Sequence, residues 1–281
     1  RRLLQLAEER LGAPPVPYAW LTLGSRARYE QALNSDQDHA MVLHDEATPE
    51  HAEYFGRLAD LVADGLVDAG YPRCPGDMMA TNPRWRVPLA EWRQQFDTWF
   101  ARPSPEALLH ASTFLDLRHV AGDADLAARL REHVRRGSSR SRLFLDHLAK
   151  QAHSAHPPLG IFRGLVVDKT GEDRDTLDIK RGGAGIVVKV ARVHGLDVGS
   201  RATSSRARIA DAVDAGRLSA TMGSDLRDAW EFLSYVRLRH QAQLLEVLLI
   251  RGQLRVLGDH LAEGAELLRQ RAVLRDRSVV V

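Results

Sequence analysis

Residues 18–44 read YAWLTLGSRARYEQALNSDQDHAMVLH. The first six residues, Tyr18–Leu23, are apolar and aromatic, which predicts a short buried strand. Gly24 and Ser25 break this strand, and the pattern of residues 26–33 is compatible with a short helix. A second apolar run, Asp38–His44, follows the turn at Asn34 and predicts another strand. We therefore expect strand, helix and strand in this order.

Two features of this stretch favour a site for phosphate and a metal ion. Gly24 and Ser25 lie where the first strand meets the predicted helix, so free backbone N–H groups and the positive end of a helix dipole would point at an anion there. Gly24 permits close approach of the backbone, and the Ser25 hydroxyl can donate to a phosphate oxygen. Asp36 and Asp38 are two residues apart at a strand entry, which places both carboxylates on one face. Mg²⁺ prefers one or two carboxylates together with substrate phosphates.

The segments around this stretch predict a mixed α and β region. Residues 71–88 are rich in Pro and Gly and are expected to form a long loop. Residues 113–120 have the pattern of a further strand, and Gly122 closes it. The helices predicted from apolar spacing in this region are residues 2–11, 50–69, 89–101 and 104–111.

The second half of the chain has mainly helical patterns. The polar run at residues 135–140 is expected to be a flexible linker, and residues 161–183 are compatible with a small hairpin. The predicted helices are residues 141–153, 184–195, 204–215 and 224–250. The sequence therefore predicts an α+β protein of two domains, with a small mixed sheet in residues 1–136 and a mainly helical domain in residues 141–281.

Composition excludes several classes of protein. The 281 residues are 44% hydrophobic and 27% charged, as in ordinary globular proteins, with a formal net charge of +2. This balance gives no reason to expect nucleic-acid binding or polybasic attachment to a membrane, and no apolar run is long enough to span one. The single cysteine, Cys74, excludes an internal disulfide and is interpreted as an ordinary loop thiol. We expect a cytoplasmic protein, and the start at Arg1 without methionine suggests that more chain precedes it.

The string Gly24-Ser25-x-x-Arg28-x-Glu30-Gln31-x-Leu33-x-x-Asp36-Gln37-Asp38 resembles the nucleotidyltransferase family known as DUF294. That family belongs to the superfamily of DNA polymerase β and is related to the bacterial uridylyltransferase and adenylyltransferase of nitrogen regulation. Further segments that resemble it are Cys74-Pro75-Gly76, Met79-Ala80-x-Asn82-Pro83-x-Trp85, Leu177-Asp178-x-Lys180-Arg181 and Arg237-Leu238-Arg239-x-Gln241. The resemblance spans nearly the whole chain. It implies a nucleotidyltransferase core followed by a helical domain that closes over the nucleotide.

The resemblance also implies a third carboxylate from a later strand. Asp116 fits this role because apolar neighbours place it mid-strand and Arg118 follows on the same face; a buried ion pair of Asp116 with Arg118 is the alternative. Asp123 is the competing acid, but it follows Gly122 and is expected to cap a helix. Asp36, Asp38 and Asp116 are thus predicted as the catalytic and metal-binding residues.

The predicted nucleotide contacts are Gly24, Ser25, Arg26 and Arg28. Glu30 is expected to hold the loop by pairing with an arginine. The chain departs from the resemblance at Ala27 and Tyr29, where the family tends to have glycine. Because alanine rarely adopts positive φ, this departure predicts a tighter phosphate loop or a shallower site.

The function implied is transfer of a nucleoside monophosphate from an NTP, with ATP favoured, to an acceptor hydroxyl with release of pyrophosphate. Mg²⁺ or Mn²⁺ is the implied cofactor. The acceptor is unidentified, and a regulatory protein or a small molecule both fit. The resemblance also implies N-terminal CBS or cyclic-nucleotide-binding domains in the full-length chain. The alternative is a regulatory module that binds nucleotide without turnover and signals to such domains.

Overall fold

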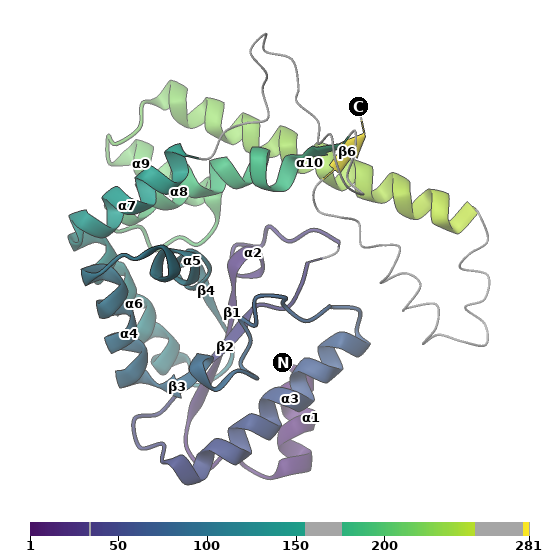
Figure 1. Ribbon diagram of the computed structural model, residues 1–281, viewed down its shortest axis with the longest axis vertical. Coiled ribbons are helices and arrows are strands. Elements are labelled where there is room, and N and C mark those ends of the chain that lie inside the picture. Colours follow the sequence, from purple (N-terminus) through teal and green to yellow (C-terminus); the bar gives the residue numbers. More distant parts are fainter. Residues whose placement is uncertain (34, 155–175, 251–277, 281) are drawn as a thin grey trace. The chain divides into compact units, whose positions relative to one another are not determined.

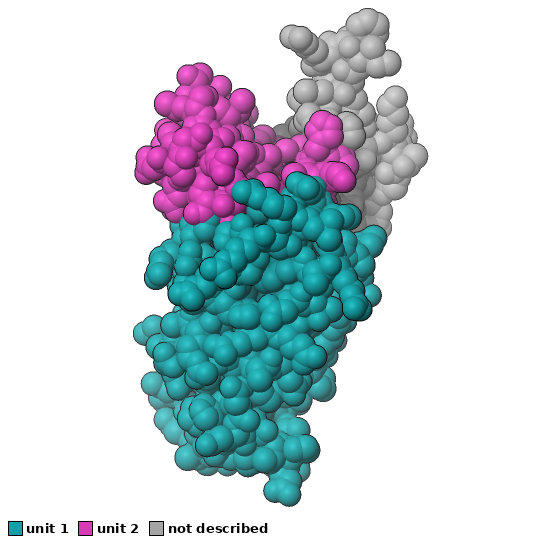
Figure 2. Space-filling model, turned by 90° about the vertical axis from the view of Figure 1, so that its left-hand side faces the viewer, with its two compact units in different colours: residues 1–31, 35–147, 199–204 teal, residues 32–34, 148–198, 205–281 magenta. Residues whose placement is uncertain are grey.

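The computed structural model describes residues 1–33, 35–154, 176–250 and 278–280 (Figure 1). The chain forms two compact units, which Figure 2 shows in different colours. The first unit comprises residues 1–31, 35–147 and 199–204, and the second comprises residues 32–34, 148–198 and 205–281. A small mixed sheet combined with many helices confirms the predicted α+β class.

The first unit is built on a four-stranded sheet with the order β3-β2-β1-β4. Strand β1 (Tyr18–Leu23) pairs antiparallel with both β2 (His39–Leu43) and β4 (Leu117–Gly122), and β2 pairs parallel with β3 (Arg86–Pro88). Every residue of β1 and β2 is buried. Both faces of these central strands are therefore covered. This burial explains why the sequences of β1 and β2 are nearly continuous apolar runs.

Helices cover the two faces of this sheet (Figure 1). On one face lie α1 (Arg2–Leu11) and α3 (Ala52–Asp68), which pack on β1 and β2 through a shared apolar cluster that includes Leu4, Trp20 and Phe55. On the other face lie α4 (Leu89–Ala101) and α6 (Ala124–Arg140). The predicted helices at 2–11, 50–69 and 89–101 are confirmed.

Three predictions for the first unit are wrong in detail. The helix expected at residues 26–33 is only α2 (Gly24–Ala27), because Tyr29 adopts a left-handed φ of 60° that ends it. The strand expected at 113–120 starts later, because α5 (Pro105–Phe114) continues into that segment. Part of the loop expected at 71–88 is a 3₁₀ turn, η2 (Pro83–Trp85), followed by β3.

The linker expected at residues 135–140 is also wrong, because these residues are the last part of α6. Ser138 is fully buried there, and a side chain at Gly137 would lie 2.5 Å from the Phe100 ring. The small residues Gly137 and Ser138, which suggested a flexible linker, therefore allow α6 to pack closely on α4. At the other end of α6 the expected cap is confirmed, since Asp123 Oδ1 accepts the Asp125 and Leu126 backbone N–H groups at 2.7 and 3.3 Å.

The second unit is mainly helical, as predicted. Its elements include the end of α7 (Arg142–His153), α8 (Gly185–Asp197), α9 (Ser205–Asp214) and α10 (Ala220–Ile250). A π-helical turn, η3 (Lys180–Ala184), leads into α8, and β5 (Thr176–Asp178) pairs antiparallel with β6 (Ser278–Val280). The hairpin predicted for 161–183 falls mostly outside the described residues. None of the described helices combines the length and the apolar character that crossing a membrane requires.

Candidate functional site

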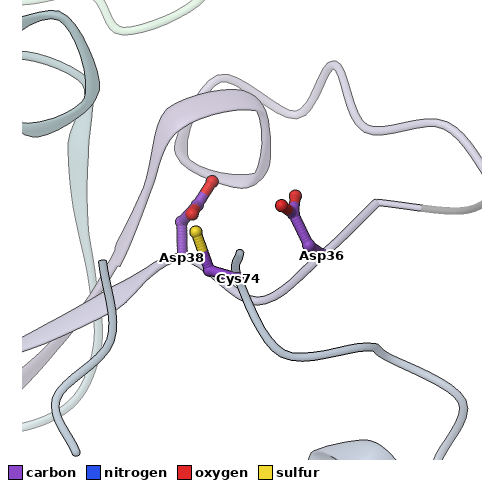
Figure 3. Close-up of side chains that lie close together, drawn as sticks. All are labelled: Asp36, Asp38 and Cys74. Carbon is purple, nitrogen blue, oxygen red and sulfur yellow. The ribbon is translucent and has the colours of Figure 1, made fainter. Parts of the chain in front are cut away.

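Two carboxylates and a thiol meet at the start of β2. Ligand atoms of Asp36, Asp38 and Cys74 all lie within 4.8 Å of one another, and each side chain is half-buried (Figure 3). The proximity of the two carboxylates agrees with the expectation from their two-residue spacing. Two such charges repel unless a cation or hydrogen-bond donors compensate them. The group is therefore a candidate cation site.

Cys74 is the member of this group that sequence reasoning missed. Burial and the charge of Asp38 raise the pKa of its thiol to about 12. At neutral pH it is consequently an uncharged S–H group beside the Asp38 carboxylate rather than a competing anion. The Cys-Pro-Gly string was visible in the sequence, but only the folded loop places it against residues nearly forty positions earlier.

The position of the two aspartates is fixed by Gln37 and His39. The Gln37 side chain is fully buried, and its Nε2 donates to the backbone oxygens of Ala63 and Tyr71 at 3.1 and 3.0 Å. His39 Nε2 lies 3.1 Å from Gln37 Oε1, and His39 Nδ1 accepts the Ala80 N–H at 2.9 Å. These bonds require the neutral Nε2–H tautomer of His39. Sequence analysis assigned no role to either residue.

The protonation of His39 predicts a pH dependence of stability. Burial, with smaller contributions from Arg26 and Arg73, lowers its pKa to about 3. As the pH falls below about 6.5, the unfolded chain binds this proton before the folded one does. The contribution of His39 is therefore complete above that pH and is lost as the pH falls toward 3.

Urea unfolding between about pH 7 and pH 4.5 measures this effect, since stability should fall more steeply in the wild type than in His39→Gln. Equal slopes in the two proteins would show that His39 does not titrate in this way.

The turn at Gly24 is held against both Asp38 and Asp116. The Leu23 N–H donates to the Asp38 carbonyl and the Gly24 N–H donates to the Asp116 carbonyl, each at 3.0 Å. Gly24 has a φ of 55°, and a Cβ atom there would lie 3.2 Å from Asp38 Oδ2. Glycine is required for both reasons: a left-handed backbone conformation and close approach to a carboxylate. The structure thus places the Gly24–Ser25 turn beside the carboxylate pair.

Asp116 lies just before β4 rather than within it, and it has a different neighbour from the one expected. Its Oδ2 atom is 2.5 Å from Arg28 Nη1, and Arg28 Nε is 2.6 Å from Glu30 Oε2. Asp116 is fully buried. Burial alone would lower the pKa of Arg28, but the Asp116 and Glu30 carboxylates raise it above its usual value. The expected pairing of Glu30 with an arginine is confirmed, whereas Arg118 is not the partner shown for Asp116.

The close group contains two of the three predicted acids. Asp36 and Asp38 lie together with Cys74, and Asp116 is not part of that group among the described residues. Arg28 uses its guanidinium to join Asp116 to Glu30, and its contact with nucleotide stays a prediction. Arg28 and Asp116 are 88 positions apart, so no local pattern in the sequence indicates that they pair.

Arg26 and Arg118 stack on aromatic rings. The Arg26 guanidinium lies 3.9 Å from the centre of the Tyr71 ring, and that of Arg118 lies 4.1 Å from the centre of the Tyr29 ring. Ala27, one of the two departures from the family pattern, is buried in α2 without a positive φ. Tyr29, the other departure, has the positive φ, and the Arg118 guanidinium stacks on its ring.

Comparison with known proteins bears on this site. Residues 1–106 match the family model described as "Putative nucleotidyltransferase DUF294", and residues 142–252 match the one described as "Putative nucleotidyltransferase substrate binding domain". A search of curated proteins found none that matches the chain. The Gly24–Ser25 turn, the carboxylate pair and Cys74 all lie within the first match. With both models matched in order along its length, the chain belongs to the DUF294 family.

Proposed function

We propose that the first unit binds a nucleoside triphosphate with a divalent cation and transfers its nucleoside monophosphate to an acceptor hydroxyl. The observation that carries this proposal is the contact of the Gly24–Ser25 turn with Asp38, whose carboxylate lies beside that of Asp36. The Gly24 N–H expected to face an anion donates to Asp116, so the Ser25 hydroxyl is the phosphate donor that we assign beside the carboxylate pair. The family match supports the class of reaction.

The donor set fits Mg²⁺ or Mn²⁺. Asp36 and Asp38 offer carboxylate oxygens, which hard divalent cations prefer, and the Cys74 thiol is neutral. When bound, the cation would neutralise phosphate charge and lower the pKa of the acceptor hydroxyl. We assign Asp36 and Asp38 as its ligands.

The other residues of the site bind the phosphates or position the Gly24–Ser25 turn. Ser25 donates its hydroxyl to a phosphate oxygen, and Arg26 attracts the triphosphate electrostatically. Asp116 and Arg28 act through the turn, because the Asp116 carbonyl holds the Gly24 N–H while Arg28 fixes the Asp116 side chain. In the reaction the acceptor oxygen forms a bond to the α-phosphorus, the bond from that phosphorus to the bridging oxygen breaks, and pyrophosphate leaves with the electron pair. The hydroxyl proton passes to solvent.

Removing the Ser25 hydroxyl tests the phosphate contact. A hydrogen bond to a charged group contributes roughly 1.5–3 kcal/mol, so Ser25→Ala should lower nucleotide affinity by about tenfold to a hundredfold. Calorimetric titration with Mg²⁺·ATP measures this change, and the melting temperature of the variant should stay near that of the wild type. Undiminished affinity would mean that the turn has only a structural role.

The acceptor can be sought by labelling. The purified protein is incubated with each of the four α-³²P-labelled NTPs, Mg²⁺ and a cell lysate, and the products are separated by size and charge. We expect cation-dependent label on a macromolecule or a small molecule, and no label with the Asp36→Asn/Asp38→Asn variant. Label that forms equally with this variant would place the activity elsewhere.

A second candidate function is nucleotide binding without turnover. It is favoured by the full burial of Asp116 and its pairing with Arg28, since the Arg28 guanidinium would compete with a cation for this third acid. In that case calorimetry would show Mg²⁺-dependent nucleotide binding, whereas no lysate fraction would yield labelled product or pyrophosphate.

A further inference from the structure

Helix α10 of the second unit carries an exposed stripe of side chains. Residues spaced four, three and four positions apart lie along one side of a helix. In α10 this spacing joins four exposed residues, Asp228, Phe232, Tyr235 and Arg239. Phe232 is 66% exposed and Tyr235 is 60% exposed, which is high for aromatic side chains. The stripe therefore has an aromatic middle and a charged residue at each end.

The two charged residues of the stripe have opposite signs and no partner within the part of the chain that the structure describes. There, neither Asp228 nor Arg239 makes an ion pair or a side-chain hydrogen bond. Glu231, beside the stripe, is by contrast 3.2 Å from Arg206. Asp228 lies four positions before Phe232, and Arg239 lies four positions after Tyr235. The stripe is thus symmetric about its aromatic middle, except that the charge changes sign.

The end of the stripe overlaps the string Arg237-Leu238-Arg239-x-Gln241, whose residues lie on two sides of α10. Gln241 is buried, and its Oε1 accepts the Leu33 N–H at 3.2 Å. Leu238 and Arg239 are exposed, and Leu238 extends the apolar surface beside Tyr235. Packing within the second unit therefore accounts for Gln241 but gives no role to the two exposed residues.

We propose that the chain forms a homodimer in which the stripes of two α10 helices pack antiparallel on each other. Antiparallel packing reverses the order of residues, so Asp228 of each copy faces Arg239 of the other, and Phe232 faces Tyr235. Four aromatic rings then meet in the middle, with one ion pair at each end. A parallel pair would instead bring like charges together at both ends. The contact uses the second unit alone and does not depend on the proposed transfer reaction.

Sedimentation equilibrium of the whole chain tests this dimer, at concentrations from about 1 to 100 μM because small interfaces bind weakly. We expect a reversible equilibrium of monomer and dimer. Tyr235→Glu places a carboxylate from each copy in the middle of the contact and should leave only monomer. The control is Met222→Glu, which adds the same charge at an exposed apolar residue of α10 outside the stripe and should associate as the wild type does. A monomeric wild type, or a Tyr235→Glu variant that still dimerises, would overturn the proposal.

Exchanging the two charges tests the antiparallel orientation. Arg239→Asp brings an acid opposite Asp228 at both ends of the contact and should raise the dissociation constant of the dimer about tenfold. Asp228→Arg/Arg239→Asp restores opposite charges and should return the dissociation constant to that of the wild type. Because both residues are exposed, circular dichroism should show the wild-type helix content in each variant. A double variant that dimerises no better than Arg239→Asp would contradict the antiparallel contact.

Discussion

The Asp36→Asn/Asp38→Asn variant is expected to lose Mg²⁺-dependent nucleotide binding while it remains folded. The two carboxylates lie within 4.8 Å of each other, so neutral amides remove both the proposed ligands and the charge that attracts the cation. Removing a group that only orients a metal ligand lowers metal affinity about 10–100-fold. Removing the ligands themselves should therefore lower the affinity by more than about 100-fold. Calorimetry with Mg²⁺·ATP measures this directly.

Asp123 and Asp125 provide a matched control for this variant. They have the same two-residue spacing at the start of α6, and Asp123→Asn retains an oxygen that can cap the helix. Asp123→Asn/Asp125→Asn should bind Mg²⁺·ATP as the wild type does. Equal loss of affinity in both variants would indicate a general effect of charge, and unchanged affinity in Asp36→Asn/Asp38→Asn would show that the site assignment is wrong.

Replacing Arg28 is expected to have the largest effect on stability. Arg28 joins the fully buried Asp116 to Glu30, at 2.5 and 2.6 Å. Arg28→Met would leave two carboxylates without their cation, and breaking a buried pair in this way typically costs about 3–5 kcal/mol. Urea denaturation measures the free energy of unfolding. Because Asp116 also holds the Gly24 turn, nucleotide affinity should fall as well.

An exposed ion pair of the same chain provides the comparison. Arg2 lies 3.4 Å from Glu9, and both side chains are more than 60% exposed. Arg2→Met should change the free energy of unfolding by less than about 1 kcal/mol, since solvent screens such pairs. Adding Asp116→Asn to Arg28→Met should recover part of the lost stability, because one uncompensated charge is removed. Similar small effects of Arg28→Met and Arg2→Met would contradict the role given to Arg28.

The elements around the site could be predicted because their signals are local. An apolar run such as Tyr18–Leu23 or the helical spacing of residues 50–69 depends only on neighbours in sequence. The same holds for the close carboxylates of Asp36 and Asp38 and for the cap at Asp123. Each of these features follows from a period of two or 3.6 residues, or from a single side chain that bonds its own backbone.

The rest of the site depends on contacts that no local pattern contains. Arg28 and Asp116 meet across 88 positions, and the sequence instead suggested Arg118, two residues away from Asp116. Cys74 reaches the carboxylates through the fold of a loop. At Tyr29, tertiary contacts hold a left-handed conformation that residue type disfavours.

The leaving group formed from ATP distinguishes nucleotidyl transfer from hydrolysis. ³¹P nuclear magnetic resonance follows the products when the protein is incubated with ATP, Mg²⁺ and the acceptor fraction found by labelling. We expect pyrophosphate from the wild-type protein and none from Asp36→Asn/Asp38→Asn. Inorganic phosphate in place of pyrophosphate, or pyrophosphate formed equally by both proteins, would contradict nucleotidyl transfer at this carboxylate pair.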